Sequence, residues 1–271
     1  MENNRFKNKN FTKKSAPSRE EQPEEHVSDL IEGRNAVTEA LRSGRPIDRV
    51  FIAEGDTGNA LSRLAGMARE AGAVVKTADR RKLDAMSESG AHQGIIAYAA
   101  AHDYATVDEI LTVAEERGEP PLIVVCDEIA DPHNLGAIIR SAECAGAHGV
   151  IIPKRRNVGL TAVVGKTSAG ALEYMKVARV ANLTSTLEAL KKQGIWVFGT
   201  SADGDRLIYD GDLKGPAAIV IGSEGFGMSR LVEEACDFKV RIPMKGSVNS
   251  LNASAAAAIL LYEAVRQRGS F

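Results

Sequence analysis

The chain has 271 residues, a hydrophobic content of 44% and a formal net charge of −2. This length suits one large or two moderate domains with an ordinary apolar core. The near-balanced charge excludes a nucleic-acid binder that relies on its overall charge, so any surface for nucleic acid has to be local.

The sequence carries no sign of export or membrane insertion. No apolar run is long enough to span a bilayer, and the first residues lack the apolar centre of a signal peptide. Three widely spaced cysteines, Cys126, Cys144 and Cys236, indicate neither a disulfide framework nor a metal site, and they fit a reducing, cytoplasmic setting. Cys126 and Cys144 lie in apolar runs and are expected in the core.

Residues 1–27 contain few apolar residues and many Asn, Lys, Glu, Pro and Ser, which is typical of a disordered segment. Basic residues dominate it up to Arg19, and glutamates follow from Glu20 to Glu25. A basic arm can add phosphate contacts that do not depend on sequence. A solvated tail without a role is the alternative.

Residues 28–102 form a first predicted unit, a small α/β sandwich. Its apolar spacing predicts helices and strands in alternation. The helices are expected at 35–41, 59–71 and 80–87, and the strands at 49–53, 73–76 and 94–99.

Two turns of this unit place glycine beside hydrogen-bonding side chains at the end of an element. They are Gly33-Arg34-Asn35 and His92-Gln93-Gly94. Bare turns are the simpler interpretation. The sharper one is an RNA-contacting edge formed by Arg34, Asn35, His92 and Gln93.

Residues 103–121 connect this unit to the rest of the chain through a predicted helix. Val107, Ile110 and Ala114 fall at helical spacing, and Pro120-Pro121 ends the segment. The second unit, residues 122–271, opens with Leu122–Asp127, a continuous apolar run closed by an acid, which is typical of a buried parallel strand.

Strands and helices alternate through this second unit, which predicts a parallel sheet covered on both faces. Further strands are expected at 149–153, 195–202, 217–225 and 238–243, and helices at 134–145, 160–168, 183–193 and 253–267. Lys154, Arg155 and Arg156 follow a predicted strand at its carboxyl end, where open α/β sheets bind ligands.

Two polar stretches follow strand ends. In NLGAIIRSA (134–142), Asn134 can cap a helix, and Arg140 stands among apolar neighbours, as a surface arginine or as a structural or catalytic ion contact. In IGSEGFGMS (221–229), three glycines allow a ligand to approach the backbone and Glu224 adds a carboxylate. The spacing is neither a dinucleotide fingerprint nor a P-loop, so a tight turn is the simpler interpretation.

A third stretch, IPMKGSVNSLNASAA (242–256), leads from a predicted strand into an alanine-rich helix. Its turn holds Ser247, Asn249, Ser250 and Asn252, whereas a helix cap needs one such residue. Burial of polar groups without partners is costly. The surplus side chains therefore satisfy an unusual backbone or hold a polar ligand.

These three stretches, in this order and spacing, resemble the signature motifs of the SpoU (TrmH-type) family of ribose 2'-O-methyltransferases. The matches run over Asn134–Ala142, Gly222–Gly227 and Ile242–Asn252, and the resemblance covers about residues 122–268. The GRNAV and HQGIIA segments are similar to the substrate-binding domain of ribosomal-RNA members, which the shorter tRNA members lack. The whole chain is most similar to the RlmB-like subgroup that methylates guanosine in large-subunit (23S) rRNA.

The resemblance implies an α/β parallel-sheet domain with a deep trefoil knot (SPOUT type), preceded by a small α/β sandwich that binds RNA. It implies a homodimer without a metal, and S-adenosylmethionine held by loops at Thr200, Gly222, Ile242 and Leu251. Basic contacts to RNA are expected from Arg155 and Arg156.

By the same resemblance, Arg140 is the central catalytic residue, and Asn134, Glu224, Ser247 and Asn249 position the ribose, the arginine or the cofactor. A guanidinium is normally always protonated, so a phosphate clamp is preferred to a general base for Arg140. Three alternatives remain: a tRNA target, an RNA-binding protein without enzymatic activity, and a nicotinamide-dependent oxidoreductase. The missing dinucleotide fingerprint argues against the last.

Overall fold

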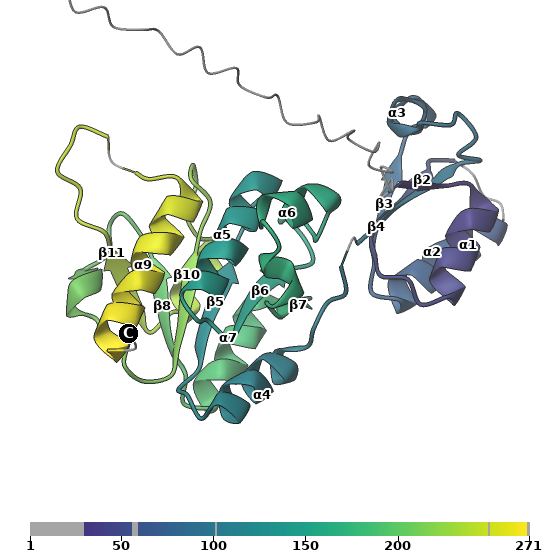
Figure 1. The fold of residues 1–271 in the computed structure, drawn as a ribbon. Helices are drawn as coiled ribbons and strands as arrows, with labels where there is room; N and C mark the ends of the chain where they lie inside the picture. The colour runs from purple at the N-terminus through teal and green to yellow at the C-terminus, as the bar shows by residue number, and fades with distance from the viewer. Residues whose placement is uncertain (1–29, 56–58, 101, 249, 270–271) are drawn as a thin grey trace, which may run out of the picture.

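The computed structural model describes residues 30–55, 59–100, 102–248 and 250–269, which fold around two β-sheets (Figure 1). The predicted charged tail lies outside these residues. Within them, no helix combines the length and the apolar character needed to cross a membrane.

The small sheet has four strands in the order β1-β4-β2-β3, with β2 and β3 parallel and the other pairs antiparallel. Helices α1 and α2 cover one face, where the larger cluster of buried side chains lies, and the short α3 covers part of the other. The bounds are β1 Leu30–Glu32, α1 Arg34–Arg42, β2 Ile47–Ala53, α2 Asn59–Glu70, β3 Val74–Ala78, α3 Arg80–Met86 and β4 Ile95–Ala99.

The large sheet has seven strands in the order β7-β6-β5-β10-β8-β11-β9, and every neighbouring pair is parallel. All five residues of β5 and of β10 are buried, because helices cover both faces at the centre of the sheet. The bounds are β5 Leu122–Cys126, β6 Gly149–Pro153, β7 Val177–Val180, β8 Trp196–Thr200, β9 Arg206–Leu207, β10 Ala217–Ile221 and β11 Phe238–Arg241.

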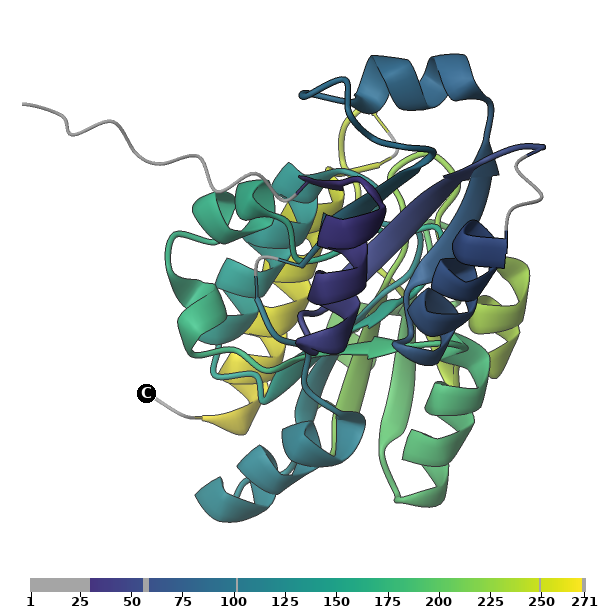
Figure 2. The same ribbon diagram turned by 90° about the vertical axis from the view of Figure 1, so that its right-hand side faces the viewer.

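Two helical layers enclose the large sheet (Figure 2). On one face lie α5 (Pro132–Cys144), α6 (Ala162–Thr167) and α9 (Ala253–Arg268). On the other lie α4 (Val107–Arg117), α7 (Leu183–Lys192) and α8 (Arg230–Ala235). Short 3-10 turns occupy Ala171–Glu173 and Ile208–Asp210. The α/β architecture and the parallel sheet predicted from the sequence are confirmed, while the knot stays a prediction.

Two predictions about single residues are wrong. Asn134 does not cap α5, because Asp131 occupies the N-cap, accepts a hydrogen bond from His133 N at 2.9 Å, and is followed by Pro132 in the first turn. Cys144 is exposed rather than in the core, since it lies one helical turn beyond Arg140 on the outer face of α5.

Candidate active site

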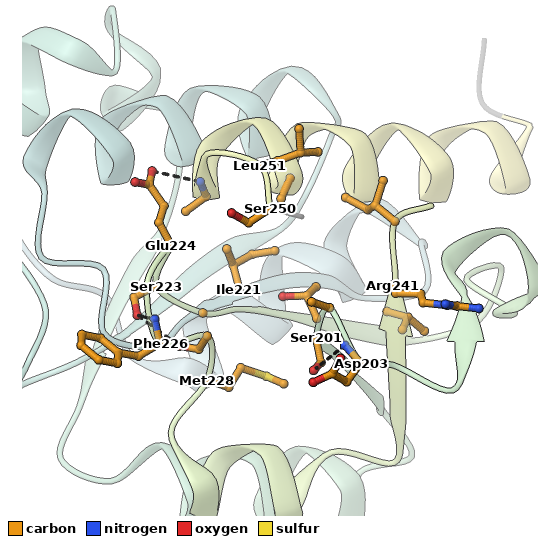
Figure 3. A pocket seen from close by; sticks show the side chains of 18 of the residues that line it. Ser201, Asp203, Ile221, Ser223, Glu224, Phe226, Met228, Arg241, Ser250 and Leu251 are labelled. Atoms are coloured by element: carbon orange, nitrogen blue, oxygen red, sulfur yellow. Dashed lines mark hydrogen bonds between the residues drawn. The ribbon is translucent and has the colours of Figure 1, made fainter. Parts of the chain in front are cut away.

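A cavity of about 440 Å³ lies at the carboxyl ends of β8, β10 and β11. Parallel strands bring these ends to one edge of the sheet, where the loops that follow them can share a ligand. Figure 3 shows how side chains from these loops converge on the cavity below α9. The loops contribute Thr200–Asp203, Ile221–Met228, Arg241, Ile242, Met244, Ser250 and Leu251 to its lining.

The glycine turn between β10 and α8 is held by its own backbone. Ser223 and Gly227 exchange two backbone hydrogen bonds of 2.9 Å, and Gly227 has a φ of 68°. A Cβ on Gly222 would lie 2.2 Å from the carbonyl carbon of Gly227 and 2.4 Å from Met228 N. The turn therefore closes only with glycine at position 222.

Asp127 anchors the far end of this turn from the neighbouring strand. It is 4% exposed, and its Oδ2 accepts hydrogen bonds from the Ser229 amide and the Ser229 hydroxyl, each at 2.7 Å. Hydrogen bonds to a buried charged acceptor are among the stronger ones in proteins. From the sequence, Asp127 is only the acid that closes a strand. Its contact with Ser229, 102 residues later, was not predicted.

The three polar stretches meet at Glu224. Its Oε1 accepts from Asn134 Nδ2 at 2.9 Å and from Ala253 N at 3.2 Å, and it also accepts from Asn252 Nδ2. The Asn252 amide donates to Asn134 Oδ1 at 2.8 Å as well. Among the described residues no donor reaches Glu224 Oε2, so this oxygen can accept a hydrogen bond from a ligand.

Asn252 has a second role as the N-cap of α9, where its Oδ1 accepts from the amides of Ser254 and Ala255. It was not among the predicted site residues. The signal that could have identified it was the surplus of Ser and Asn in its turn. One of the four residues serves as the cap, and Ser250 lines the cavity.

The remaining predicted site residues divide into two groups. Thr200, Gly222, Ile242 and Leu251 line the same cavity as Glu224. Ser247 is exposed in a bend outside the cavity lining, and Asn249 lies outside the described residues. The guanidinium of Arg140 is exposed on α5, makes no hydrogen bond or ion pair with the residues that the structure describes, and does not line the cavity.

The small unit brings its two predicted turns together. The Arg34 amide donates to Gln93 Oε1 and the Arg34 Nε donates to the Gln93 carbonyl, both at 3.1 Å. Both residues line a cavity of about 690 Å³ that also includes Arg80 and Glu54. Asn35 is exposed at the start of α1, next to Arg34.

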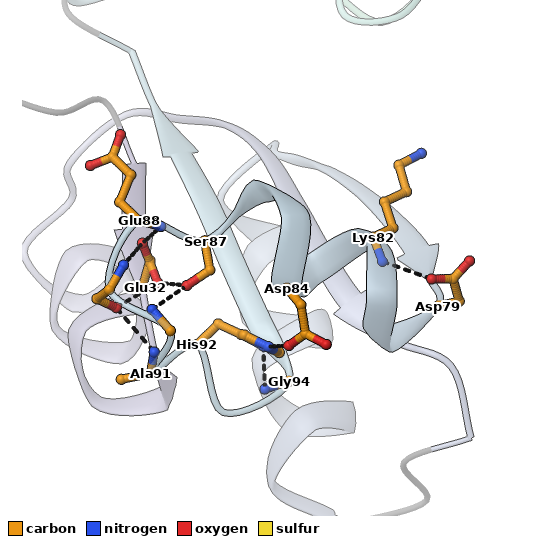
Figure 4. Close-up of polar contacts among 11 residues, drawn as sticks. Glu32, Asp79, Lys82, Asp84, Ser87, Glu88, Ala91, His92 and Gly94 are labelled. Atoms are coloured by element: carbon orange, nitrogen blue, oxygen red, sulfur yellow. Dashed lines mark hydrogen bonds and ion pairs between the residues drawn. The ribbon is translucent and has the colours of Figure 1, made fainter.

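His92 is only 3% exposed and supports the second turn from inside (Figure 4). Its Nδ1 accepts from Gly94 N at 3.0 Å, and its Nε2 lies 2.9 Å from Asp84 Oδ1. Because Nδ1 is an acceptor, Nε2 carries the proton that is shared with Asp84. The ring can contribute to RNA binding only by holding this turn.

Glu32 holds the preceding loop (Figure 4). Its carboxylate accepts from the hydroxyls of Ser87 and Ser89 and from the amides of Glu88 and Ser89. Desolvation raises the pKa of Glu32, but these four hydrogen bonds outweigh it and lower the pKa to about 2.

Arg155 and Arg156 are exposed at the carboxyl end of β6. Arg156 pairs with Glu128 at 3.0 Å, so its charge is partly matched within the chain. Within the described ranges, no group of three or more His, Cys, Asp or Glu side chains is placed to hold a metal ion.

Comparisons with known proteins agree on one family. Residues 121–262 match the model of the SpoU rRNA Methylase family, and residues 30–105 match a model described as RNA 2'-O ribose methyltransferase substrate binding. The putative TrmH family tRNA/rRNA methyltransferase YacO of Bacillus subtilis (strain 168) is 48% identical over 240 residues, which cover 89% of this chain and 96% of that protein.

Two solved structures are also similar. The SpoU methyltransferase AviRb from Streptomyces viridochromogenes, in complex with the cofactor AdoMet, is 29% identical with a TM-score of 0.57, and the match covers 89% of this chain and 90% of that one. The TrmH/SpoU tRNA modifying enzyme of A. aeolicus is 28% identical with a TM-score of 0.51, covering 60% of this chain and 83% of that one.

The fold, the cavity at the carboxyl edge and these matches define an RNA methyltransferase that uses S-adenosylmethionine as its methyl donor. The chain belongs to the SpoU rRNA methylase family.

Proposed function

We propose that this protein methylates a ribose 2'-hydroxyl of RNA, and that its target is a guanosine of large-subunit (23S) rRNA. The observation that carries the proposal is the meeting of Asn134, Glu224 and Asn252 at the rim of the cavity. The match of residues 30–105 to a 2'-O ribose methyltransferase substrate-binding model supports the ribose hydroxyl as acceptor.

The choice of rRNA rests on the small unit. The structure described as a tRNA modifying enzyme covers 60% of this chain, whereas AviRb covers 89%. An added unit whose paired turns carry Arg34 beside Arg80 gives the chain a second place to hold a large RNA. The name of the Bacillus subtilis relative includes both tRNA and rRNA, so tRNA is the alternative target.

We assign the cavity at the carboxyl edge to the cofactor, with Thr200, Gly222, Ile242 and Leu251 among its contacts. Ile221, Met228 and Leu260 supply apolar walls for an aromatic base, and the glycine turn supplies peptide groups that a ligand can approach closely. S-adenosylmethionine supplies a methyl group bound to a positively charged sulfur. The carboxylates of Glu224 and Asp203 in the cavity lining suit a ligand that carries positive charge.

We propose that Arg140 acts on the substrate from the second protomer of a homodimer. In one chain its guanidinium lies outside the cavity. The neighbouring helix α9 exposes Ile259 and Tyr262, which are 37% and 53% accessible and three residues apart on one helix face. A second copy packed on this apolar surface would bury it. The proposed dimer works in the cytoplasm, where the three free cysteines stay reduced.

A guanidinium can form two parallel hydrogen bonds to a phosphate but cannot give up its proton. We therefore propose that Arg140 clamps the phosphate beside the target ribose and orients the 2'-hydroxyl for in-line attack. Arg140→Lys keeps the charge but loses the two parallel N–H donors of the guanidinium. We expect turnover to fall by about 10- to 100-fold at unchanged cofactor affinity. Turnover near the wild-type value would contradict the clamp.

Mixing two inactive variants tests the contribution of the partner. Arg140→Ala removes the clamp and Gly222→Val closes the cavity, so each homodimer lacks one half of every site. If Arg140 acts in trans, mixed dimers contain one complete site and activity returns on mixing. Activity that stays absent after proven subunit exchange would place Arg140 in the site of its own chain.

The target is tested with labelled S-adenosylmethionine and with total rRNA and total tRNA offered separately. Label at a guanosine 2'-oxygen of 23S rRNA is expected, and such a nucleotide resists alkaline cleavage at its 3' side. Label only in tRNA would keep the chemistry and overturn the rRNA target. Cofactor binding without label in either RNA would contradict free RNA as the substrate and direct the assay to ribosomal particles.

A further inference from the structure

A buried ion pair joins the two sheets, although its members are 131 residues apart in the chain. Asp48 lies on β2 and Arg179 on β7, and their side chains are only 9% and 7% exposed. Arg179 Nη1 donates to Asp48 Oδ1 at 2.5 Å, and Nη2 donates to the Asp48 carbonyl at 3.0 Å. Both charges are largely removed from water and each is the ionic partner of the other, so the pair strongly opposes separation of the two units.

Tyr104 extends this cluster into the connector. Its hydroxyl donates to Asp48 Oδ1 at 2.6 Å and accepts from Leu160 N at 2.9 Å, and the Arg179 guanidinium lies 5.2 Å from the centre of its ring. Burial and the charge of Asp48 raise the pKa of Tyr104 above its usual range, so the hydroxyl stays protonated. The connector is thereby tied to both sheets at one point.

The surroundings of the cluster leave little room for another arrangement. A Cβ on Gly159 would lie 1.8 Å from Asp48 Oδ2 and 2.8 Å from the Tyr104 hydroxyl. Ala105 N donates to the Val177 carbonyl at 2.8 Å, and Arg179 Nη2 reaches the Lys154 carbonyl at 3.4 Å. Hydrogen bonds and ion pairs are directional, so contacts of this kind fix the orientation of the small unit relative to the large sheet. An apolar interface would constrain this orientation less.

The junction lies on the same edge of the large sheet as the cofactor cavity. Lys154 follows the carboxyl end of β6 and Arg179 is close to that of β7, while the cavity follows β8, β10 and β11. All seven strands run in the same direction. The small unit is therefore held beside the edge at which methyl transfer is proposed (Figure 1, Figure 2).

We propose that the cluster of Asp48, Arg179 and Tyr104 fixes the span between the RNA-contacting turns of the small unit and the cofactor cavity, and thereby selects which nucleotide of a bound RNA is methylated. These three side chains are positioning residues, since none of them lines the cavity. The inference rests on the proposed role of the small unit in RNA binding.

The test uses the full chain with Asp48→Asn, Arg179→Gln, Tyr104→Phe and the double variant Asp48→Asn/Arg179→Gln. Asp103→Asn is the matched control, because it removes an exposed carboxylate from the same connector. The readouts are small-angle scattering, the Kd for S-adenosylmethionine, kcat and KM on rRNA, and the map of methylated nucleotides.

We expect the charge variants to bind S-adenosylmethionine within twofold of the wild type and to show a wider scattering envelope. Their KM for rRNA should rise at least tenfold while kcat changes less than threefold, and label should appear at additional nucleotides. Tyr104→Phe should show a smaller change in the same direction. Asp103→Asn should match the wild type in every readout.

An unchanged envelope, KM and label position in the charge variants would overturn the proposal. If a single variant fails to fold, the double variant decides, because it removes the pair without leaving a lone buried charge. Failure of the proposed RNA function is distinguishable: the wild type would then lack rRNA methylation, while scattering would still report whether the cluster holds the two units together.

Discussion

The two regions that carry functional turns hold them by different means. In the large sheet the glycine turn is closed by its own backbone, through the bonds between Ser223 and Gly227 and the close packing of Gly222. In the small unit the loop before β4 is held by side chains, namely the carboxylate of Glu32 and the imidazole of His92. One region therefore depends on the absence of a side chain and the other on the presence of ionisable ones.

This difference has a consequence for both sites. The glycine turn is closed by backbone hydrogen bonds, with the Asp127 carboxylate only at its far end, so its peptide groups stay in place for a ligand whose shape does not vary. A turn held by a carboxylate can weaken when that carboxylate is protonated. We therefore expect a side chain added at the glycine turn to weaken cofactor binding strongly. In the RNA-contacting unit we expect single substitutions to lower stability by small amounts, and acid to lower it as well.

The largest effect is expected from Gly222→Ala. The new methyl group would meet backbone atoms at 2.2 and 2.4 Å, which cannot rotate away as a side chain can. Overpacking of this kind costs about 1–3 kcal/mol, and we expect the Kd for S-adenosylmethionine to rise by up to ~100-fold in calorimetry. Gly215→Ala is the control, because a Cβ there meets nothing within 4 Å and the residue does not line the cavity. Equal effects of the two variants would contradict the backbone account.

A smaller effect is expected from Asp127→Asn, which tests whether the turn also needs its one buried charge. The amide oxygen can still accept from Ser229, but the bonds lose their ionic character. We expect a loss of about 1–2 kcal/mol, seen as a roughly tenfold rise in the Kd for S-adenosylmethionine. Ser229→Ala removes one of the two donors and should give about half of the loss. An unchanged Kd would show that the backbone alone holds the turn.

The large sheet has an acid-sensitive group of its own, far from the glycine turn. Burial is the main cause that lowers the pKa of His148, against the opposing hydrogen bond to Glu119. Leu122 N donates to His148 Nδ1 at 2.9 Å, which requires the neutral ring. Because the folded pKa lies below that of the unfolded chain, stability is complete above about pH 6.5 and falls as the pH drops below it.

The variant His148→Gln keeps an acceptor for Leu122 but cannot titrate. We expect the wild-type Tm to fall by a few degrees more than that of the variant between pH 7 and pH 5. The control His133→Gln, at an exposed position, should follow the wild type. Parallel curves for wild type and His148→Gln would show that the buried ring makes no contribution.

The smallest effect is expected from Glu32→Gln in the small unit. The pKa of Glu32 is lowered to about 2, so its contribution is present above about pH 4.5 and is lost as the pH falls toward 2. Since the carboxylate is close to solvent, screening keeps the contribution near 1 kcal/mol. Acid unfolding of the small unit should shift to higher pH in the variant. Hydrogen exchange of the β4 amides measures this shift. A stability of the variant equal to that of the wild type across this range would contradict the prediction.

Most helices and strands were predictable, because their apolar spacing is a local property of the chain. The elements missed are the short β1, β7 and β9 and the helix α8, which have two to six residues each. β1 and β7 lie at sheet edges, where one side of the strand has no neighbour to demand an apolar pattern. Arg179 is an example: a charged residue in β7 whose burial depends on a partner from the other unit.

The candidate site was predictable in part. The order of three motifs identified the family and brought Thr200, Gly222, Ile242 and Leu251 forward as cofactor contacts, and all four line one cavity. The sequence does not distinguish the members of the polar turn, because Ser247, Asn249, Ser250 and Asn252 have similar chemistry. Only the fold shows that Asn252 reaches Glu224 and that Ser247 is exposed and does not line the cavity.

The sequence by itself determined the alternation of strands and helices, the parallel sheet and the family with its cofactor, because these depend on local periodicity and on residues within single motifs. The tertiary structure decided which side chains meet: Glu224 with Asn134, Asp127 with Ser229, and Asp48 with Arg179, at separations of 90, 102 and 131 residues. For the first two pairs the physical reason is the order of strands in the large sheet, where β5 and β10 are neighbours, and for the third it is the packing of the small unit against β7. Non-consecutive strands lie side by side, and no local pattern in the chain records which of them are neighbours.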